Sequence, residues 1–140
     1  MNPTIRQLLD TADLLIGKDG SPVDASVAVT AVPAPPAVLT TTAASRCRGA
    51  AFALRAALES AVTACLTTHG APRTIREGTM RGALLWLRCC TEAGTARRTK
   101  AAWSRLCLGC HYHQYEIGPT EDQVRAWRTE VATVIALLAP

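Results

Sequence analysis

The chain has 140 residues, which is enough for one domain with a hydrophobic core but too short for two. Apolar residues make up 49% of it and aromatic residues only 4%, a balance that predicts an all-α protein packed through small side chains. A net charge of +4 at pH 7 attracts a polyanion only modestly, and no apolar run approaches the roughly 20 residues of a membrane span. With no basic leader or cleavage site at its start, the protein is expected to be cytoplasmic and to make no contact with a membrane.

Residues 4–16 form the first predicted helix, which ends at Gly17 as a C-terminal cap. Its apolar residues share one helical stripe: Ile5, Leu8, Leu9, Ala12 and Leu15. Residues 18–43 then carry four prolines among many Ala, Thr and Ser residues and follow neither the helical nor the strand period. We therefore predict an N-terminal helix in residues 1–17 and a Pro/Ala/Thr-rich loop or linker in residues 18–43.

Four more helices are predicted over about residues 45–68, 74–93, 96–110 and 120–138. Gly70 and Gly94 end the first two, and Thr120 with Gln123 forms a capping box that begins the last. Because the connections are short, residues 44–140 should form an antiparallel four-helix bundle, with the N-terminal helix laid against it. The three tryptophans fall on or beside the core stripes and are interpreted as core residues: Trp86, Trp103 and Trp127.

The stretch CLGCHYHQYE, residues 107–116, begins with the Cys-x-x-Cys-His pattern of a haem attachment site. Such attachment generally follows export, for which the sequence shows no signal, and the chain has little aromatic surface to enclose a porphyrin. We therefore predict no haem and no other cofactor. In a reducing compartment the six cysteines are expected to be mostly buried thiols.

Zinc is an alternative interpretation of the same stretch. The ligands would be Cys107, Cys110, His111 or His113, and Cys90 or its neighbour Cys89. Adjacent cysteines on a helix point about 100° apart, so only one of the upstream pair could reach the metal. This pair also lacks the Cys-x-x-Cys spacing, which weakens the zinc interpretation.

Arg105 lies near the end of the third predicted bundle helix, and His111, His113 and Tyr115 follow it before the capped last helix. This arrangement resembles the HEPN superfamily (higher eukaryotes and prokaryotes nucleotide-binding) of four-helix bundles. Its members carry an Arg followed four to six residues later by a His, often as His-x-Tyr. Residues 103–127 are also similar to the C-terminal part of small actinobacterial proteins with a His-rich turn before the last helix. The resemblance implies a homodimer whose motif segments face one shared cleft.

The sequence departs from the HEPN pattern at Leu106, where catalytic members usually have a polar residue. The spacing from Arg105 fits His111, whereas the His-x-Tyr element fits His113. On a continuous helix His113 lies about 80° around the axis from Arg105, and His111 lies about 120° away on the other side. His113 is therefore favoured if the helix continues, and His111 if the helix breaks at Gly109.

The resemblance implies a metal-independent endoribonuclease of toxin or defence type that produces 2',3'-cyclic phosphates. Such an enzyme needs a base with a near-neutral pKa for the 2'-hydroxyl and a fixed cation for the scissile phosphate. Arg105 would be the cation, His111 or His113 the base, and Tyr115 would orient the histidine or contact the phosphate. A basic run beside them is assigned to RNA binding: Arg97, Arg98 and Lys100.

A second hypothesis, favoured by Leu106, is a non-catalytic helical module of the same fold that binds a nucleotide or a protein partner such as an antitoxin. A third is a helical protein stabilised by zinc. Each site residue also has a purely structural interpretation. An Arg or His near a helix C-terminus often complements the dipole or caps carbonyls, and a basic run is more often a solvated helix face than a binding site.

Overall fold

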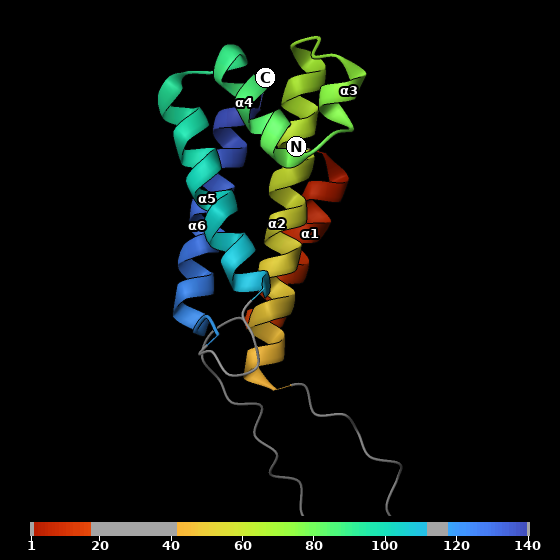
Figure 1. Ribbon diagram of the computed structural model, residues 1–140. Helices are drawn as coiled ribbons and strands as arrows, with labels where there is room; N and C mark the ends of the chain where they lie inside the picture. Colours follow the sequence, from red (N-terminus) through yellow and green to blue (C-terminus); the bar gives the residue numbers. More distant parts are fainter. Residues whose placement is uncertain (1, 18–41, 112–117, 140) are drawn as a thin grey trace, which may run out of the picture.

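The structure is a computed structural model that describes residues 2–17, 42–111 and 118–139. These residues form six helices and no strand, which confirms the predicted all-α class (Figure 1). The helices are α1 (Pro3–Ile16), α2 (Ala43–Thr68), α3 (Arg73–Arg76), α4 (Met80–Cys90), α5 (Ala93–His111) and α6 (Glu121–Leu138). Together they make a helical bundle. The predicted linker lies largely outside the described residues.

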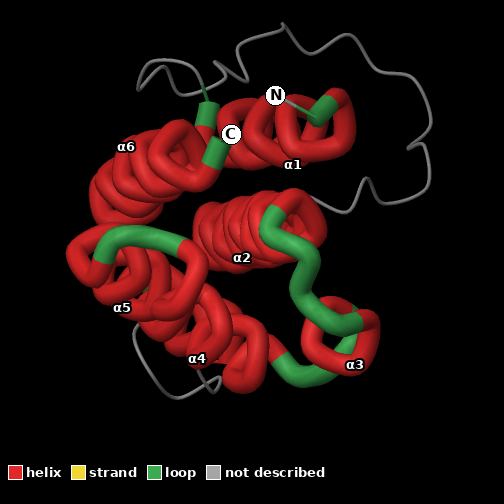
Figure 2. Tube along the Cα trace, turned by 90° about the horizontal axis from the view of Figure 1, so that it is seen from above, coloured by secondary structure: helices red, strands yellow, loops and turns green. Residues whose placement is uncertain are grey.

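Helix α2 is the central helix, and each of the other five contacts it (Figure 2). Alanines and larger aliphatic residues alternate at its buried positions, among them Ala50, Leu54, Ala57, Leu58, Ala61, Val62 and Leu66. The alanines allow neighbouring helices to come close, and the larger residues fill the space between them. A helix that is apolar around most of its circumference is typical of a protein core.

By length and composition alone, α2 is the one helix among the described residues that could cross a membrane. Of its most apolar stretch of 18 residues, 56% is buried inside the bundle. Because the core helix of a folded protein meets the same criteria, this observation is weak evidence for a membrane span, and the expected absence of membrane contact stays a prediction.

The predicted N-terminal helix is confirmed as α1, which packs against α2 and α6. Its buried residues are Ile5, Leu9, Ala12 and Ile16, and all of them belong to the same core as α2. On the side facing α6, Arg128 donates two hydrogen bonds to the carboxylate of Asp13, with Nη2 to Oδ2 at 2.7 Å and Nε to Oδ1 at 2.9 Å. The N-terminal helix is therefore part of the bundle core.

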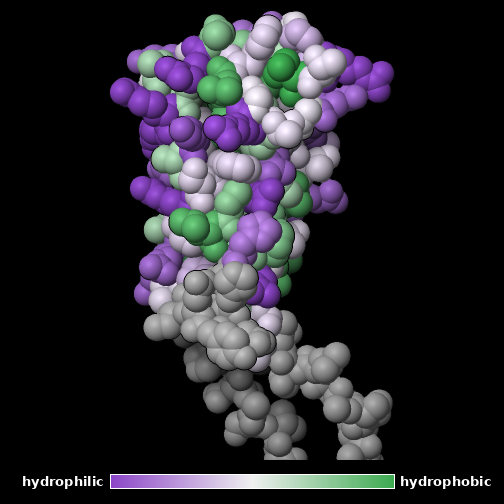
Figure 3. Space-filling model, in the orientation of Figure 1, coloured by the Kyte–Doolittle hydropathy of each residue, from purple (hydrophilic) through white to green (hydrophobic). Residues whose placement is uncertain are grey.

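Hydrophilic side chains cover much of the face drawn in Figure 3, with apolar side chains exposed between them. In the described part of the chain the exposed large apolar residues are Leu14, Phe52, Leu85, Trp86, Leu108 and Leu137. Two of these are neighbours on α4, where Leu85 is 59% exposed and Trp86 is 37% exposed. The core assignment of Trp86 is therefore wrong, whereas Trp103 and Trp127 are half-buried against the core.

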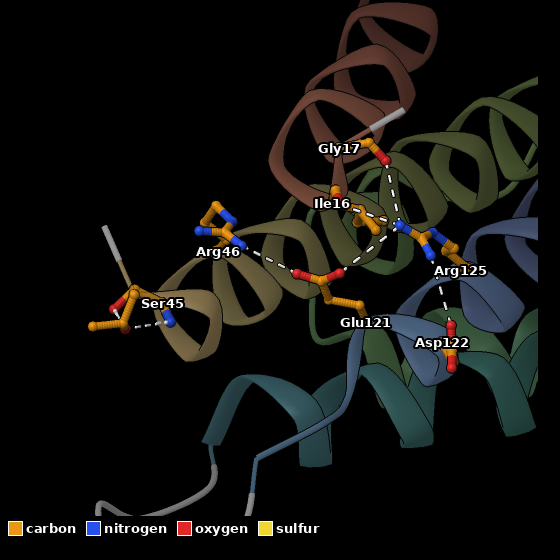
Figure 4. A network of polar contacts seen from close by, with 8 residues as sticks. Ile16, Gly17, Ser45, Arg46, Glu121, Asp122 and Arg125 are labelled. Atoms are coloured by element: carbon orange, nitrogen blue, oxygen red, sulfur yellow. Dashed lines mark hydrogen bonds and ion pairs between the residues drawn. The ribbon is translucent and has the colours of Figure 1, made fainter. Parts of the chain in front are cut away.

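A polar network joins three helix ends on one side of the bundle (Figure 4). Glu121, the first residue of α6, accepts a hydrogen bond from Arg46 of α2 at 3.1 Å. Arg125 lies 3.8 Å from the other carboxylate oxygen of Glu121 and donates to the carbonyl oxygens of Ile16 and Gly17, each at 3.5 Å. These carbonyls end α1, so Arg125 gives two terminal acceptors a partner and fixes α1 against α6.

The prediction of one continuous helix over residues 74–93 is wrong, because the chain turns between α3 and α4. Thr79 caps α4, and its Oγ1 accepts a hydrogen bond from the backbone N–H of Gly82 at 3.3 Å. A Cβ atom at Gly78 would lie 2.5 Å from the carbonyl oxygen of Thr74, so the turn requires glycine there. The Thr79 cap and the turn at Gly78 interrupt the helix here, although the apolar residues of this segment recur with a helical period.

The last helix agrees with its prediction. The hydroxyl of Thr120 accepts from the backbone N–H of Gln123 at 3.2 Å, and the Gln123 side chain accepts from the backbone N–H of Thr120 at 3.0 Å. This confirms the capping box at the start of α6. The predicted core stripe is also buried at Val124, Val131, Val134 and Leu138.

Candidate functional site

Arg105 and His111 both lie on α5, and both are exposed. The helix continues through Gly109 to His111. Of the two alternatives considered, this is the one in which helix geometry favours His113, a residue that lies outside the described part of the chain. Gly109 has a packing role, because a Cβ atom there would lie 2.6 Å from the ring of Trp127 on α6. His111 follows Arg105 by six positions on a continuous helix, which places them about 120° apart around the axis. The structure therefore directs them to different sides of α5.

Arg105 lies on the side of α5 that faces α6. Seven residues before it, on the same face, Arg98 donates two hydrogen bonds to Glu130 of α6, at 3.1 and 2.9 Å. The hydrogen bonds from Arg98 lower the pKa of Glu130, and the positive charge of Arg105 adds to this effect. Arg98 and Arg105 thus share the electrostatic environment of one carboxylate.

His111 points toward α2, where Nη1 of Arg55 lies 3.2 Å from its Nε2 atom. The ring also meets the edge of Phe52, with 6.4 Å between the ring centroids and 76° between the planes. A guanidinium can only donate hydrogen bonds, so Nε2 of His111 is the acceptor in this pair. The Nε2 lone pair is therefore engaged by Arg55, and it can take a proton from another group only when this guanidinium turns to a different acceptor.

Arg55 is held in place by two further side chains. Its Nε atom donates to Oε1 of Glu59 at 2.8 Å, and the indole N–H of Trp103 donates to the same oxygen at 3.0 Å. Its guanidinium lies 5.6 Å from the centroid of the Trp103 ring, within the range of a cation–π contact. The hydrogen bond to Glu59 raises the pKa of Arg55 above its usual value. We call Arg55, Glu59, Trp103 and His111 the Arg55 cluster.

The sequence interpretation missed Arg55 and Glu59, although both carry a visible signal. They are the two charged residues between residues 49 and 68, in the largely apolar central helix α2, and they are four residues apart. A charged pair inside such a helix must either reach solvent or have a partner. Here the pair does both, because the Arg55 side chain is 26% exposed and the Glu59 side chain is 38% exposed.

The six cysteines are all free thiols, as expected, but only Cys47, Cys65 and Cys110 are buried. Burial raises the pKa of the Cys110 thiol and of the half-buried Cys107 thiol, and nearby Arg55 partly opposes this. Both groups are therefore protonated at neutral pH and are poor nucleophiles.

The proposed zinc ligands are not brought together. The described residues contain no group of three or more His, Cys, Asp or Glu side chains that could hold a metal ion. Cys90 ends α4 and lies near Cys65 of α2, whose pKa is raised mainly by burial and also by Cys90. Cys107 and Cys110 instead lie beside Arg55, a cation that would oppose binding of a metal ion. Among the described residues, Cys107, Cys110, His111 and Cys90 are therefore not gathered into a zinc site, and the alternative ligand His113 lies outside them.

The cations predicted to bind RNA are divided between two sides of α5. Arg98 pairs with Glu130 on α6, whereas Arg97 and Lys100 line a groove of about 680 Å³ between α4 and α5. Trp103 lies at the boundary of this groove and the Arg55 cluster, because it lines the first and donates to Glu59 in the second.

His113 and Tyr115 lie outside the described residues, so their predicted roles stay predictions. Comparisons of this chain with protein family models, with curated proteins and with solved structures found no match.

Proposed function

We propose that this protein is a HEPN-like, metal-independent endoribonuclease of toxin or defence type, in which His111 is the base and Arg55 the cation. The supporting observation is the 3.2 Å contact between Nη1 of Arg55 and Nε2 of His111 at an exposed position. It joins a positive charge to an imidazole, the two groups that metal-free cleavage of RNA requires. In the predicted pair, Arg105 had the role that this proposal gives to Arg55.

The chemistry follows from these two groups. When Nη1 of Arg55 turns from Nε2 of His111 to the phosphate, Nε2 takes the proton of a ribose 2'-hydroxyl, and the 2'-oxygen attacks the adjacent phosphorus. The bond to the 5'-oxygen breaks, this oxygen takes a proton from water, and a 2',3'-cyclic phosphate remains. Arg55 stabilises the charge that builds up on the phosphate oxygens, and Glu59 and Trp103 fix the direction of its guanidinium.

The HEPN resemblance supplies the wider frame of the proposal. The four longer helices that follow the linker would be the family bundle, with α1 as the added helix: α2, α4, α5 and α6. A cytoplasmic homodimer would bring two such motif segments into one cleft. Arg97 and Lys100 would hold RNA phosphates, because both are exposed and together with His111 they fall on one face of α5.

The test incubates mixed RNA with the protein in EDTA and measures 2',3'-cyclic phosphate ends. We expect cleavage by the wild type and a loss of roughly 10²- to 10⁴-fold in the His111→Ala variant. Arg55→Lys keeps the charge but not the forked geometry, and should also lose most of the activity. The matched control is Arg105→Ala, which removes one exposed cation from the other side of α5 and should keep its activity.

Two results would contradict this assignment. If wild-type protein leaves RNA intact in EDTA, the metal-free mechanism is wrong. If His113→Ala and Arg105→Ala abolish cleavage while His111→Ala does not, the family's own Arg and His arrangement is used, and Arg55 has a structural role.

A non-catalytic module that binds a protein partner is the second candidate. The observation that favours it is Leu106, which has no exposed surface. Catalytic HEPN proteins usually have a polar residue at this position, and here the position belongs to the hydrophobic core. A folded wild-type protein that lacks ribonuclease activity but binds a partner would favour this candidate.

A further inference from the structure

The groove between α4 and α5 is formed by one face of each helix. On α4 that face carries Arg81, Leu84, Leu85 and Arg88, which are spaced at i, i+3, i+4 and i+7. On α5 it begins with the small residues Ala93 and Ala96 and continues with Arg97, Lys100 and Trp103. The small side chains of Ala93 and Ala96 leave room between the two helices. From residue 93 to residue 104 the groove is about 16 Å long, or three helical turns.

The groove has an aliphatic floor. Leu84 is buried, but its neighbour Leu85 is 59% exposed, and no other described helix covers this face. The view in Figure 3 shows apolar side chains at the surface near the end of the bundle where α4 lies, with hydrophilic ones around them. An exposed aliphatic strip bounded by polar residues is typical of an interaction surface.

The charge around this floor has one sign. Arg81, Arg88, Arg97 and Lys100 line the groove, and no Asp or Glu is among its described lining residues. None of the four makes an ion pair within the described part of the chain, where the ion pairs all involve other arginines. Four unpaired cations at the rim of an aliphatic floor are complementary to a ligand that combines carboxylates with aliphatic side chains.

We propose that this groove binds an acidic amphipathic helix of a partner protein. The partner's Leu-type side chains would pack on Leu85 and on the alanines of α5, and its Asp or Glu side chains would pair with the cations of both rims. A second copy of this chain fits poorly, since its net charge of +4 would face a basic surface.

Single-stranded RNA fits the floor less well than a helix does. Non-specific sites for single strands use exposed aromatic platforms on which bases stack. The one aromatic residue among the described lining residues is Trp103, and Arg55 lies against its ring while Glu59 accepts from its N–H. The leucines and alanines of the groove therefore favour contact with the apolar side chains of a polypeptide over contact with nucleic-acid bases.

The groove is next to the Arg55 cluster, and Trp103 belongs to both. A helix bound in the groove would cover Arg97 and Lys100, the cations that we assign to RNA phosphates. The partner would therefore compete with RNA. Binding of the helix itself does not depend on the ribonuclease proposal and is measured without RNA.

The experiment uses a fluorescent helical peptide of about 14 residues, roughly four turns, with Leu at i, i+3, i+4 and i+7 and Glu on the flanking positions. Its binding to full-length protein is measured by anisotropy. One control peptide has the same composition with the Leu positions scrambled, and another has Lys in place of Glu. A single-stranded oligouridine of similar charge is the third probe.

We expect the acidic amphipathic peptide to bind at least about tenfold more tightly than either control peptide. Leu85→Asp, and separately Arg88→Glu with Lys100→Glu, should each weaken it about tenfold or more. These positions are exposed, so the folds should be unchanged by circular dichroism. The matched control is Arg6→Glu, an exposed cation of α1, which should have no effect on binding.

Several results would overturn the proposal. Equal binding of the scrambled peptide would mean that charge alone attracts it, and loss of binding in Arg6→Glu would mean that the groove is not the site. Oligouridine that binds more tightly than the acidic peptide, and whose binding falls with the uncharged change Leu85→Ser, would identify the groove floor as an RNA site. If no peptide binds while RNA is cleaved, the groove proposal fails and the ribonuclease proposal stands. If the peptide binds and RNA is not cleaved, the reverse holds.

Discussion

The two sides of α5 carry similar charges but have different surroundings. On the side toward α6, Arg98 is bound to Glu130 by two hydrogen bonds, and Arg105 lies close enough to the same carboxylate to affect its pKa. On the other side, Arg97 and Lys100 line a groove with no described carboxylate. A run of cations in a sequence is therefore not one surface, because the helical period divides it. Among the cations of the basic run on α5, Arg97 and Lys100 are therefore available for a ligand, whereas Arg98 is paired with Glu130.

The largest effect that follows from this comparison concerns activity. We call the side of α5 that carries Arg97, Lys100 and His111 the open side, and the side that carries Arg98 and Arg105 and faces α6 the closed side. Replacing His111 on the open side should reduce any ribonuclease rate by about 10²-fold or more, whereas replacing Arg105 on the closed side should leave the rate unchanged. Initial rates measured with saturating RNA at one salt concentration check this, with thermal unfolding as the test of folding. Equal losses in the two variants would mean that the division of α5 into an open and a closed side has no functional meaning.

The second prediction concerns the closed side, which depends on the close approach of α5 to α6 at Gly109. In Gly109→Val the added side chain would collide with Trp127, since a Cβ atom alone would lie 2.6 Å from the ring. We expect the free energy of unfolding to fall by on the order of 1–3 kcal/mol. Gly94→Val is the matched control, because a Cβ there meets no atom within 4 Å. Urea unfolding curves that coincide for the two variants would contradict this packing role.

Much of the architecture was predictable from sequence because it depends on neighbouring residues. The capping box of Thr120 and Gln123 and the buried stripe of α1 depend on contacts within one or two helical turns, and both were predicted. The turn between α3 and α4 also depends on neighbouring residues. It was not predicted, because the apolar residues of residues 74–93 recur with the period of one continuous helix. A glycine directly before a threonine cap, Gly78 and Thr79, was the signal that should have outweighed the period.

The candidate site was less predictable, because its central contact joins distant residues. Arg55 and His111 are 56 residues apart, and their pairing requires α2 and α5 to pack side by side at one register. The sequence pattern supplied the histidine but attached it to Arg105, the nearest cation along the chain. Sequence proximity on a helix decides which residues share a face, and only packing decides which faces meet.

The third prediction compares the two sides by salt dependence. If RNA binds the open side, replacing both Arg97 and Lys100 with Ala should weaken RNA binding by about tenfold and reduce the slope of log K against log salt. The double change of Arg98 and Arg105 to Ala should leave that slope nearly unchanged, although it removes the same charge. Filter binding with a catalytically inactive His111→Ala background measures both without cleavage.

If both double variants reduce the slope equally, RNA responds to net charge and does not distinguish the sides of α5. This outcome would leave the groove free for a polypeptide partner and would separate the RNA site from it.

The smallest expected effect is the pH dependence of the stability that the Arg98–Glu130 ion pair contributes on the closed side of α5. Hydrogen bonds from Arg98, with the charge of Arg105, lower the pKa of Glu130 below its usual value of 4.5. A carboxyl group whose pKa is lower in the folded state stabilises that state above the unfolded pKa. Its contribution then declines as the pH falls below about 4.5 and is lost below the folded pKa.

Wild type should therefore be slightly more stable than Glu130→Gln at neutral pH, by less than about 1 kcal/mol for so exposed a pair. Urea unfolding at pH 7 and at acid pH measures the difference, which should disappear at the lower pH. A difference that persists at low pH would mean that Glu130 acts through packing, and that the carboxylate charge does not close this side of α5.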